Sequence, residues 1–343
     1  MQSEPTSNTP TLPSTEPAHE HGGSLAEARR LFPSAPEPFL DLSTGINPTA
    51  YPIGELPPEA WSRLPEPGTE SALRRAAALA YGAADPAMVV AAPGTQLLIS
   101  LLPHLLPYRD IAIIGPTYGE HLATWRQAGA TVTELTDPAA ARAPCLVLCN
   151  PNNPDGRRFE PKRLLALADD LASRDGLLIV DEAFADFTPE LRLAPALPHP
   201  ALLILRSFGK TYGLAGIRLG FALTTPSRAG RLREALGPWA ISGPALEIGR
   251  RALTDSTWLQ TQNEELARAA HRLDALLSRA GLTVRGGTTL FRLADSPRAA
   301  HLFNQLGSAG IWVRRFAAHP TWLRFGLPNA EPAWSRLEAA LRR

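Results

Sequence analysis

The chain has 343 residues, a formal net charge of +1 and 44% hydrophobic residues. This length favours about two domains, and the composition is that of a globular protein with a sizeable core. A charge balance near zero argues against nucleic acid as the main partner. No apolar run approaches the ~20 residues that span a bilayer. Residues 1–20 lack the basic and apolar regions of a secretory signal, so we expect a cytoplasmic protein with a disordered tail.

The first two thirds of the ordered chain alternate short apolar runs with helical patterns. The helical patterns cover residues 24–31, 69–82, 95–106, 120–128 and 161–174. The strand-like runs are MVVAA, DIAII, CLVLC, GLLIVDEAF, ALLILRSF and IRLGFAL. Cys145 and Cys149 lie in the third of these runs, and their spacing indicates buried thiols in a strand. Continuous apolar runs separated by helices predict an α/β fold with a three-layer, mostly parallel central sheet.

The pattern changes after Pro238. A long helix is expected over residues 257–280, followed by the short strands LTVRG, TTLFRLA, IWVRRF and WLRFGL among helices. We interpret this part as a smaller α+β domain. The expected division is a large domain over residues 40–237, and a small domain formed by residues 21–39 together with 238–343.

Five polar or glycine-rich motifs follow predicted strands. They are APGTQ, GPTYG, NPNNPDG, DEAF and SFGK. Ligands of open α/β sheets bind at the carboxyl ends of the strands. Each motif alone is also compatible with an ordinary turn, but together they predict one site assembled from several loops.

The SFGK motif contains one of only two lysines in the chain, Lys210. Gly209, Lys210 and Thr211 resemble the end of a nucleotide-binding P-loop, but that motif requires a glycine where Ile204 stands. The alternative is a lysine amine used as a nucleophile. Lysine forms Schiff bases with carbonyl substrates and with pyridoxal phosphate (PLP), and an arginine cannot replace it.

A pyridoxal site needs further parts besides the lysine. Asp181, at the end of a predicted strand, is the candidate acid for the pyridine nitrogen. The helix that opens with Gly94, Thr95 and Gln96 offers backbone N–H groups to a phosphate, and the side chains of Thr95 and Gln96 are expected to matter little. Ser207 and Arg218 would complete the phosphate site, and Tyr118 would stack on the ring.

These residues resemble the PLP-dependent enzymes of the aspartate aminotransferase fold. The pattern S-x-x-K with an arginine eight residues after the lysine matches Ser207, Lys210 and Arg218. Asn153 stands in the family's N-P-x-G motif, which implies a hydrogen bond to the cofactor's phenolic oxygen. Arg324, in WLRFG, matches the arginine that binds the substrate carboxylate. The resemblance extends from about residue 21 to the end of the chain.

Within this fold, the sequence is similar to the branch that holds histidinol-phosphate aminotransferases and threonine-phosphate decarboxylases. The HGGS segment at 21–24, LDLSTGINP at 40–48 and Phe184 in DEAF resemble the decarboxylases, which make aminopropanol phosphate for cobalamin. The resemblance therefore implies decarboxylation of threonine phosphate, with an aminotransferase as the alternative. A non-catalytic effector domain of a transcription regulator is disfavoured because no helix-turn-helix pattern precedes the fold.

The substrate phosphate needs cationic or polar ligands of its own. Arg314 matches an arginine of the branch and is the first candidate, with Arg315 second because only one of two adjacent residues in a strand can face the site. His21 and Asn47 are further candidates, although a structural role is open for both. The resemblance also implies a homodimer. Here Leu64 occupies the place of a tyrosine that in relatives reaches the partner subunit's cofactor, and Tyr51 is a possible substitute.

Overall fold

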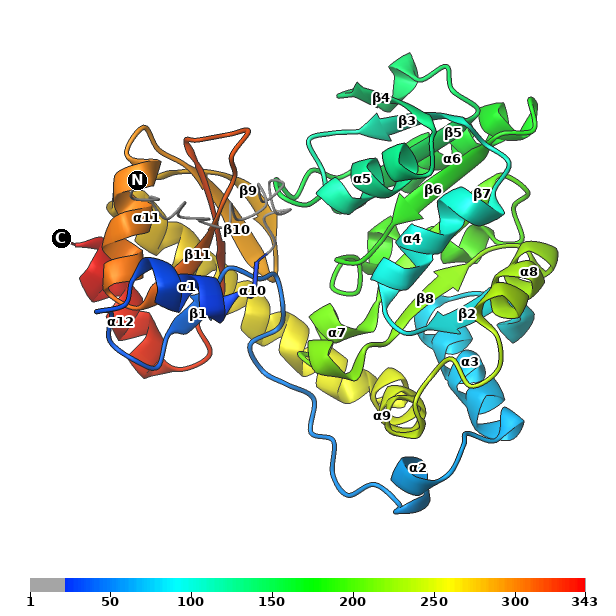
Figure 1. The fold of residues 1–343 in the computed structure, drawn as a ribbon, viewed down its shortest axis with the longest axis horizontal. Helices are drawn as coiled ribbons and strands as arrows, with labels where there is room; N and C mark the ends of the chain where they lie inside the picture. Colours follow the sequence, from blue (N-terminus) through cyan, green and yellow to red (C-terminus); the bar gives the residue numbers. More distant parts are fainter. Residues whose placement is uncertain (1–21, 343) are drawn as a thin grey trace, which may run out of the picture.

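The structure is a computed structural model that describes residues 22–342. The predicted tail at 1–20 and the candidate ligand His21 lie outside these described residues. Two sheets organise the chain (Figure 1). The larger one forms the core of the large domain, and the smaller one forms the core of the small domain.

The larger sheet has seven strands among the described residues. Their order across the sheet is β2 (Val89–Ala92), β8 (Gly220–Leu223), β7 (Leu202–Ser207), β6 (Leu177–Asp181), β5 (Cys145–Cys149), β3 (Asp110–Ile114) and β4 (Thr131–Leu135). Neighbouring strands pair in parallel except at β8, which is antiparallel to both β2 and β7. Strand β4 has no counterpart among the predicted strands, because this edge strand is partly exposed along its length and lacks a continuous apolar run.

Helices cover both faces of this sheet, as the apolar runs predict. One face packs against α3 (Pro67–Tyr81), α6 (Pro161–Ala172) and α9 (Gly243–Thr254). The other face packs against α4 (Thr95–Leu105), α5 (Gly119–Gln127) and α8 (Pro226–Leu236). Side chains of successive strand residues enter opposite cores, which explains why each strand is apolar throughout. The predicted three-layer α/β class is confirmed.

The smaller sheet has the order β1 (Leu40–Leu42), β11 (Ile311–Arg315), β12 (Trp322–Gly326), β10 (Phe291–Asp295) and β9 (Thr283–Thr288). Among the described strands of this smaller sheet, only β1 and β11 pair in parallel. The apolar residues of α1 (Leu25–Leu31), α10 (Ser256–Arg279), α11 (Ala299–Ser308) and α12 (Glu331–Leu341) form one core with this sheet. The Ser24 hydroxyl caps α1 by accepting the N–H of Glu27 at 3.3 Å, as expected.

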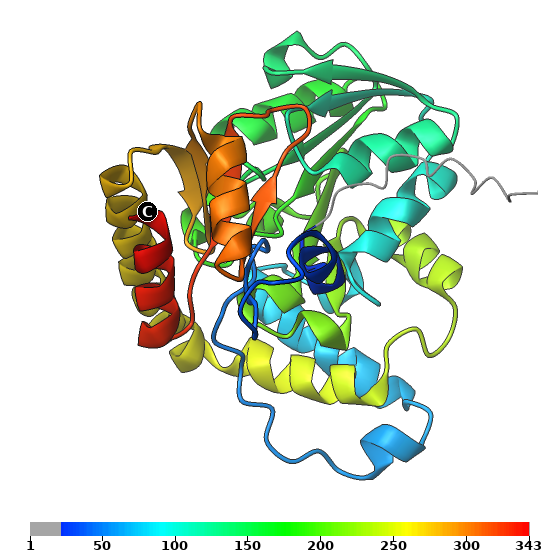
Figure 2. The same ribbon diagram turned by 60° about the vertical axis from the view of Figure 1, so that its left-hand side comes forward.

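Two elements lie outside the domain boundaries that the sequence suggested. Strand β1 begins at residue 40 but belongs to the small sheet, because it pairs with β11. Helix α9 follows residue 238 but packs on α3 in the large-domain core. Helix α10 then connects the two domains, as the yellow and gold segments of Figures 1 and 2 show. We propose that the boundaries run just after residue 42 and near the start of α10.

Within residues 22–342, no helix is long and apolar enough to cross a membrane. The cytoplasmic location stays a prediction. Cys145 and Cys149 are buried free thiols in β5, as their spacing indicated.

Candidate active site

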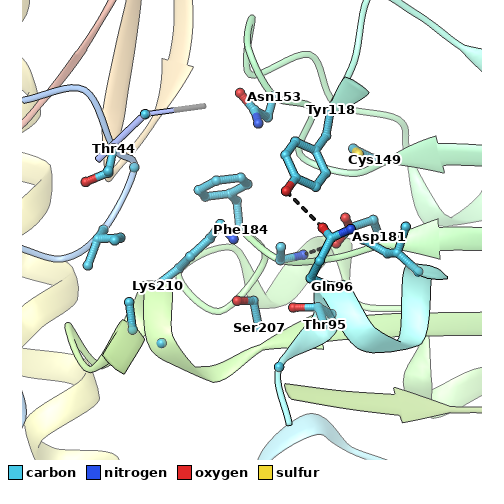
Figure 3. A pocket seen from close by; sticks show the side chains of 18 of the residues that line it. Thr44, Thr95, Gln96, Tyr118, Cys149, Asn153, Asp181, Phe184, Ser207 and Lys210 are labelled. Atoms are coloured by element: carbon cyan, nitrogen blue, oxygen red, sulfur yellow. Dashed lines mark hydrogen bonds between the residues drawn. The ribbon is translucent and has the colours of Figure 1, made fainter. Parts of the chain in front are cut away.

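A cavity of about 280 Å³ lies at the carboxyl ends of β5, β6 and β7 (Figure 3). Its lining includes the predicted residues Gly94, Thr95, Gln96, Tyr118, Asn153, Asp181, Ser207, Lys210, Arg218 and Arg324. Most of them come from the large domain, whereas Arg324 comes from β12 of the small domain. Residues 44–46, just after β1, also line the cavity. The site is therefore shared between the two domains.

Lys210 lies on the short helix α7 (Phe208–Thr211), which directly follows β7. Its side chain extends toward Phe184, with Nζ 5.4 Å from the centre of that ring (Figure 3). Burial lowers the pKa of Lys210, although the nearby Asp181 carboxylate opposes this effect. A lowered pKa favours the neutral amine, which is the nucleophilic form.

Asp181 ends β6 and is held as an anion by contacts inside the protein. Its Oδ2 lies 3.0 Å from Nε2 of His121, and its Oδ1 accepts the N–H of Ala183 at 3.0 Å. Burial alone would raise the pKa of Asp181, but the hydrogen bond and charge of His121, together with Lys210, lower it. A buried carboxylate that stays ionised can stabilise a positive charge placed beside it.

His121 was not among the predicted site residues. It lies on α5, where burial disfavours its charged form, but the neighbouring Cys149 and the hydrogen-bonded Asp181 raise its pKa to about 10. His121, Cys149 and Asp181 have their ligand atoms within 4.8 Å of one another. A single histidine within a helical pattern carries no sequence signal that distinguishes this role from an ordinary buried histidine.

The residues of the predicted phosphate site lie together around the start of α4. Gly94 has a left-handed φ of 85°, and a Cβ there would lie 2.7 Å from Nη2 of Arg218. Gly220 allows β8 to approach this turn, because its Cβ would lie 2.5 Å from the N of Thr95. Among the described residues Arg218 donates only to the carbonyl of Ala215, at 3.2 Å, and has no carboxylate partner. A helix N-terminus beside a cation without a carboxylate fits a phosphate.

The side chain of Gln96 has a defined role, contrary to the expectation that only its backbone matters. Its Oε1 accepts the hydroxyl of Tyr118 at 3.0 Å, and its Nε2 donates to Oε2 of Glu120 at 3.0 Å. Burial, with the nearby carboxylates of Glu120 and Asp181, raises the pKa of Tyr118 to about 12. The phenol therefore stays protonated and its ring is held in one orientation over the cavity.

Arg324 is buried and reaches the cavity from β12. Its Nη1 donates to Oδ1 of Asn153, and its Nη2 donates to the carbonyl of Ser43 at 2.8 Å. Its Nε has no hydrogen-bond partner among the described residues. Burial, with the neighbouring Arg314, lowers the pKa of Arg324 to about 9. A buried guanidinium with an unused N–H is suited to bind an anion.

Arg314 and Arg324 are cross-strand partners on β11 and β12, so their side chains lie on the same face of the small sheet. Arg314 borders a small hollow with Gly22 and Ser43, next to the cavity. Arg315 also borders this hollow, but it is the cross-strand partner of Leu323, so its side chain starts on the face of the sheet opposite to that of Arg314 and Arg324. This arrangement supports Arg314 over Arg315 as the ligand of a substrate phosphate.

The structure does not bring Asn47 to the cavity. Its Nδ2 donates to the carbonyl of Thr211 at 3.0 Å and to Oε1 of Gln262 at 3.2 Å, and its Oδ1 accepts the N–H of Thr49 at 2.9 Å. Because the carboxamide is fully used inside the protein, we leave Asn47 out of the proposed substrate site. These contacts support a structural role for Asn47, which the sequence had left open.

Comparisons with known proteins place the chain in a family. Residues 57–336 match the family model described as "Aminotransferase class I and II", and the chain belongs to this family. A relative named threonine-phosphate decarboxylase from Pseudomonas aeruginosa is 44% identical over 94% of this chain and 97% of its own length. A second relative of that name, from a Sinorhizobium species, is 43% identical over 94% of this chain and 97% of its length.

A solved structure confirms the fold. Histidinol-phosphate aminotransferase from Sinorhizobium meliloti, in complex with pyridoxal-5'-phosphate, superposes with a TM-score of 0.80 at 21% identity and covers 96% of this chain and 97% of its own. The predicted family and its cofactor, PLP, are confirmed by these findings. The residues present fit this cofactor: a lysine of lowered pKa, an ionised acid backed by a histidine, and an arginine without a carboxylate at a helix N-terminus.

Proposed function

We propose that the chain is a PLP-dependent decarboxylase. It converts L-threonine O-3-phosphate to (R)-1-amino-2-propanol O-2-phosphate and carbon dioxide, a reaction of cobalamin biosynthesis. The observation that carries this proposal is the match, at 43–44% identity over almost the whole chain, to two relatives named threonine-phosphate decarboxylase. The cavity supports it with one set of groups for PLP and separate arginines for two substrate anions.

The residues divide into those that hold PLP and those that hold the substrate. Lys210 would bind PLP covalently through Nζ, Asp181 would bind its pyridine nitrogen, and the start of α4 with Ser207 and Arg218 would bind its phosphate. Tyr118 would stack on the ring, and Asn153 would donate to the phenolic oxygen. When bound, PLP accepts the electron pair that a bond at the substrate Cα releases.

The protein decides which bond breaks by how it orients the substrate. Arg324 binds the substrate carboxylate, and Arg314 binds its phosphate, so the substrate is held at both ends by cross-strand partners. Lys210 then supplies a proton to Cα once carbon dioxide has left. Asp181 remains ionised throughout, because His121 holds its pKa below the usual range.

One pair of assays tests the proposal. The protein is incubated with threonine phosphate and carbon dioxide is measured, and then with histidinol phosphate and 2-oxoglutarate, and glutamate is measured. We expect carbon dioxide in the first assay and no glutamate in the second. Glutamate without carbon dioxide would mean that the chain is an aminotransferase.

We also propose a homodimer. Trp61 and Leu64, on and just after the short helix α2 (Glu59–Ser62), are 70% and 65% exposed, and Trp239 is 57% exposed. Large apolar side chains that are this exposed indicate a protein interface. Within the chain, the hydroxyl of Tyr51 donates to Asp255 at 3.3 Å, and its role as a substitute for the relatives' tyrosine stays a prediction. Light scattering after gel filtration should give twice the chain mass, and Trp61→Glu should give monomers.

A further inference from the structure

A buried cluster of charged side chains lies behind the active site and does not line the cavity. Its centre is Arg206, which is fully buried in β7. The Arg206 Nη1 donates to Oε2 of Glu182 at 2.6 Å, and Nη2 donates to Oδ1 of Asp186. The guanidinium also lies 4.5 Å from the ring centre of Tyr81. Burying three charges is costly unless they are paired, and here each charge has a partner.

Two cluster members, Glu182 and Arg206, are next to residues of the proposed active site in the chain. Glu182 directly follows Asp181, and Arg206 directly precedes Ser207. Side chains of successive residues in a strand point to opposite sides, so at the end of β7 Ser207 enters the cavity while Arg206 enters the cluster. Asp181, the last residue of β6, lines the cavity, and Glu182, directly after it, contacts Arg206 in the cluster. The ends of β6 and β7, which carry Asp181 and Ser207, are therefore linked by the contact between Glu182 and Arg206 on the side away from the cavity.

The cluster also reaches the lysine. The hydroxyl of Thr211 donates to Oδ2 of Asp186, and Thr211 directly follows Lys210. From the other side, Asn47 donates its N–H to the carbonyl of Lys210 at 2.8 Å and its Nδ2 to the carbonyl of Thr211 at 3.0 Å. The four-residue helix α7 is too short to hold its own position, so these contacts fix it.

We propose that the cluster of Arg206, Glu182, Asp186 and Thr211 is a positioning device that sets the placement of Lys210 relative to Asp181. Arg206 bridges the carboxylates of Glu182 and Asp186. Asp186 in turn accepts the hydroxyl of Thr211, so the position of α7 depends on the position of Asp186. The cluster residues do not line the cavity and act only through their neighbours in the chain. The proposal rests on the roles proposed above for Lys210 and Asp181, but not on which substrate bond breaks.

Thr211→Val is the variant that tests this most directly. It removes the hydrogen bond to Asp186, keeps the shape of the side chain and leaves both contacts of Arg206 to carboxylates in place. We expect the dissociation constant of PLP, measured by absorbance titration of the apoprotein, to rise about tenfold. We expect kcat to fall about tenfold, because a displacement of about 1 Å costs up to 10²-fold. The KM for threonine phosphate should stay within twofold, because Arg324 and Arg314 lie in the other domain.

Thr224→Val is the matched control. Thr224 is equally buried, and its hydroxyl donates to the carbonyl of Leu202 at 2.8 Å and accepts from Arg228 at 2.8 Å, at the opposite edge of the sheet. Both variants should lose thermal stability, but only Thr211→Val should alter PLP binding and kcat. Thr211→Ser, which keeps the hydroxyl, should restore both.

Two results would overturn the proposal, with all measurements made well below the melting temperatures. One is a Thr211→Val protein that binds PLP and turns over as the Thr224→Val protein does. The other is a Thr211→Ser protein as impaired as Thr211→Val. If wild-type protein releases no carbon dioxide, the proposed reaction fails, but the PLP titrations still decide whether the cluster positions Lys210.

Discussion

Replacing His121 by glutamine should remove a pH-dependent part of the stability of the apoprotein. His121 is buried against Asp181, and its pKa is raised from 6.5 to about 10. A raised pKa means that the folded protein binds the proton more tightly than the unfolded chain. The contribution is therefore complete below about pH 6.5 and is lost as the pH rises toward 10. Its size is at most about 5 kcal/mol, at ~1.4 kcal/mol for each pH unit.

The assay is urea unfolding of both apoproteins between pH 6 and 10, followed by circular dichroism. The apoprotein is used because bound PLP would add its own pH dependence. The difference in unfolding free energy between wild type and His121→Gln should decrease as the pH rises above about pH 7, by at most ~1.4 kcal/mol for each pH unit. The part of the substitution's cost that does not depend on pH is the same at every pH, so it does not affect this slope.

His199→Gln is the matched control. His199 also contacts a carboxylate, at 3.1 Å, but that partner, Asp169, is 76% exposed. An ion pair with an exposed partner contributes about 0–1 kcal/mol, so the difference from wild type should stay small across the range. If the wild-type and His121→Gln stabilities run parallel from pH 7 to 10, His121 is not the charged partner of Asp181.

Four further substitutions test the site. Lys210→Arg should fold normally and lose carbon dioxide release by about 10³-fold or more, because a guanidinium cannot act as the nucleophile. Arg324→Lys should lower kcat/KM for threonine phosphate roughly 10–100-fold, since a single ammonium nitrogen does not reproduce the planar fork that contacts Asn153 and Ser43 through two nitrogens. Gly94→Ala should weaken PLP binding in fluorescence titrations of the apoprotein, because its Cβ would meet Arg218. Phe184→Tyr should lower the pH midpoint of the bound cofactor's absorbance, since it adds a hydrogen-bond donor to the cofactor's anionic form. Unchanged values would contradict the respective assignments.

The sequence alone predicted the features that depend on local pattern. A strand that is apolar on both faces is buried when helices cover both sides of its sheet. The α/β class and six of the large-sheet strands could therefore be predicted from the apolar pattern. The candidate cofactor lysine, its candidate acid and the candidate phosphate loop were proposed from residue types at fixed spacings. They line one cavity because the carboxyl ends of parallel strands meet at one edge of the sheet. An edge strand such as β4 has no such pattern and was missed.

Only the tertiary structure could show which residues support the site from a distance in sequence. His121 is 60 residues from Asp181, and no local pattern links a histidine on α5 to a carboxylate on β6. Asn47 looked like a substrate ligand, yet its carboxamide is used by Thr211 and Gln262, which are 164 and 215 residues away. Whether a polar side chain faces a cavity or another polar group depends on packing, and a short motif does not encode it.

The same distinction applies to the domains and to Arg206. A composition change near Pro238 indicated a second domain. Residues 40–42 also belong to it, because β1 pairs with β11, which lies near the other end of the chain. Arg206 appeared in sequence only as part of an apolar strand, whereas the fold surrounds it with Glu182, Asp186 and Tyr81. Sequence determined which chemistry the chain carries, because that depends on residue types at short spacings. The fold decided which side chains hold that chemistry in place, because those contacts form only when distant segments pack together.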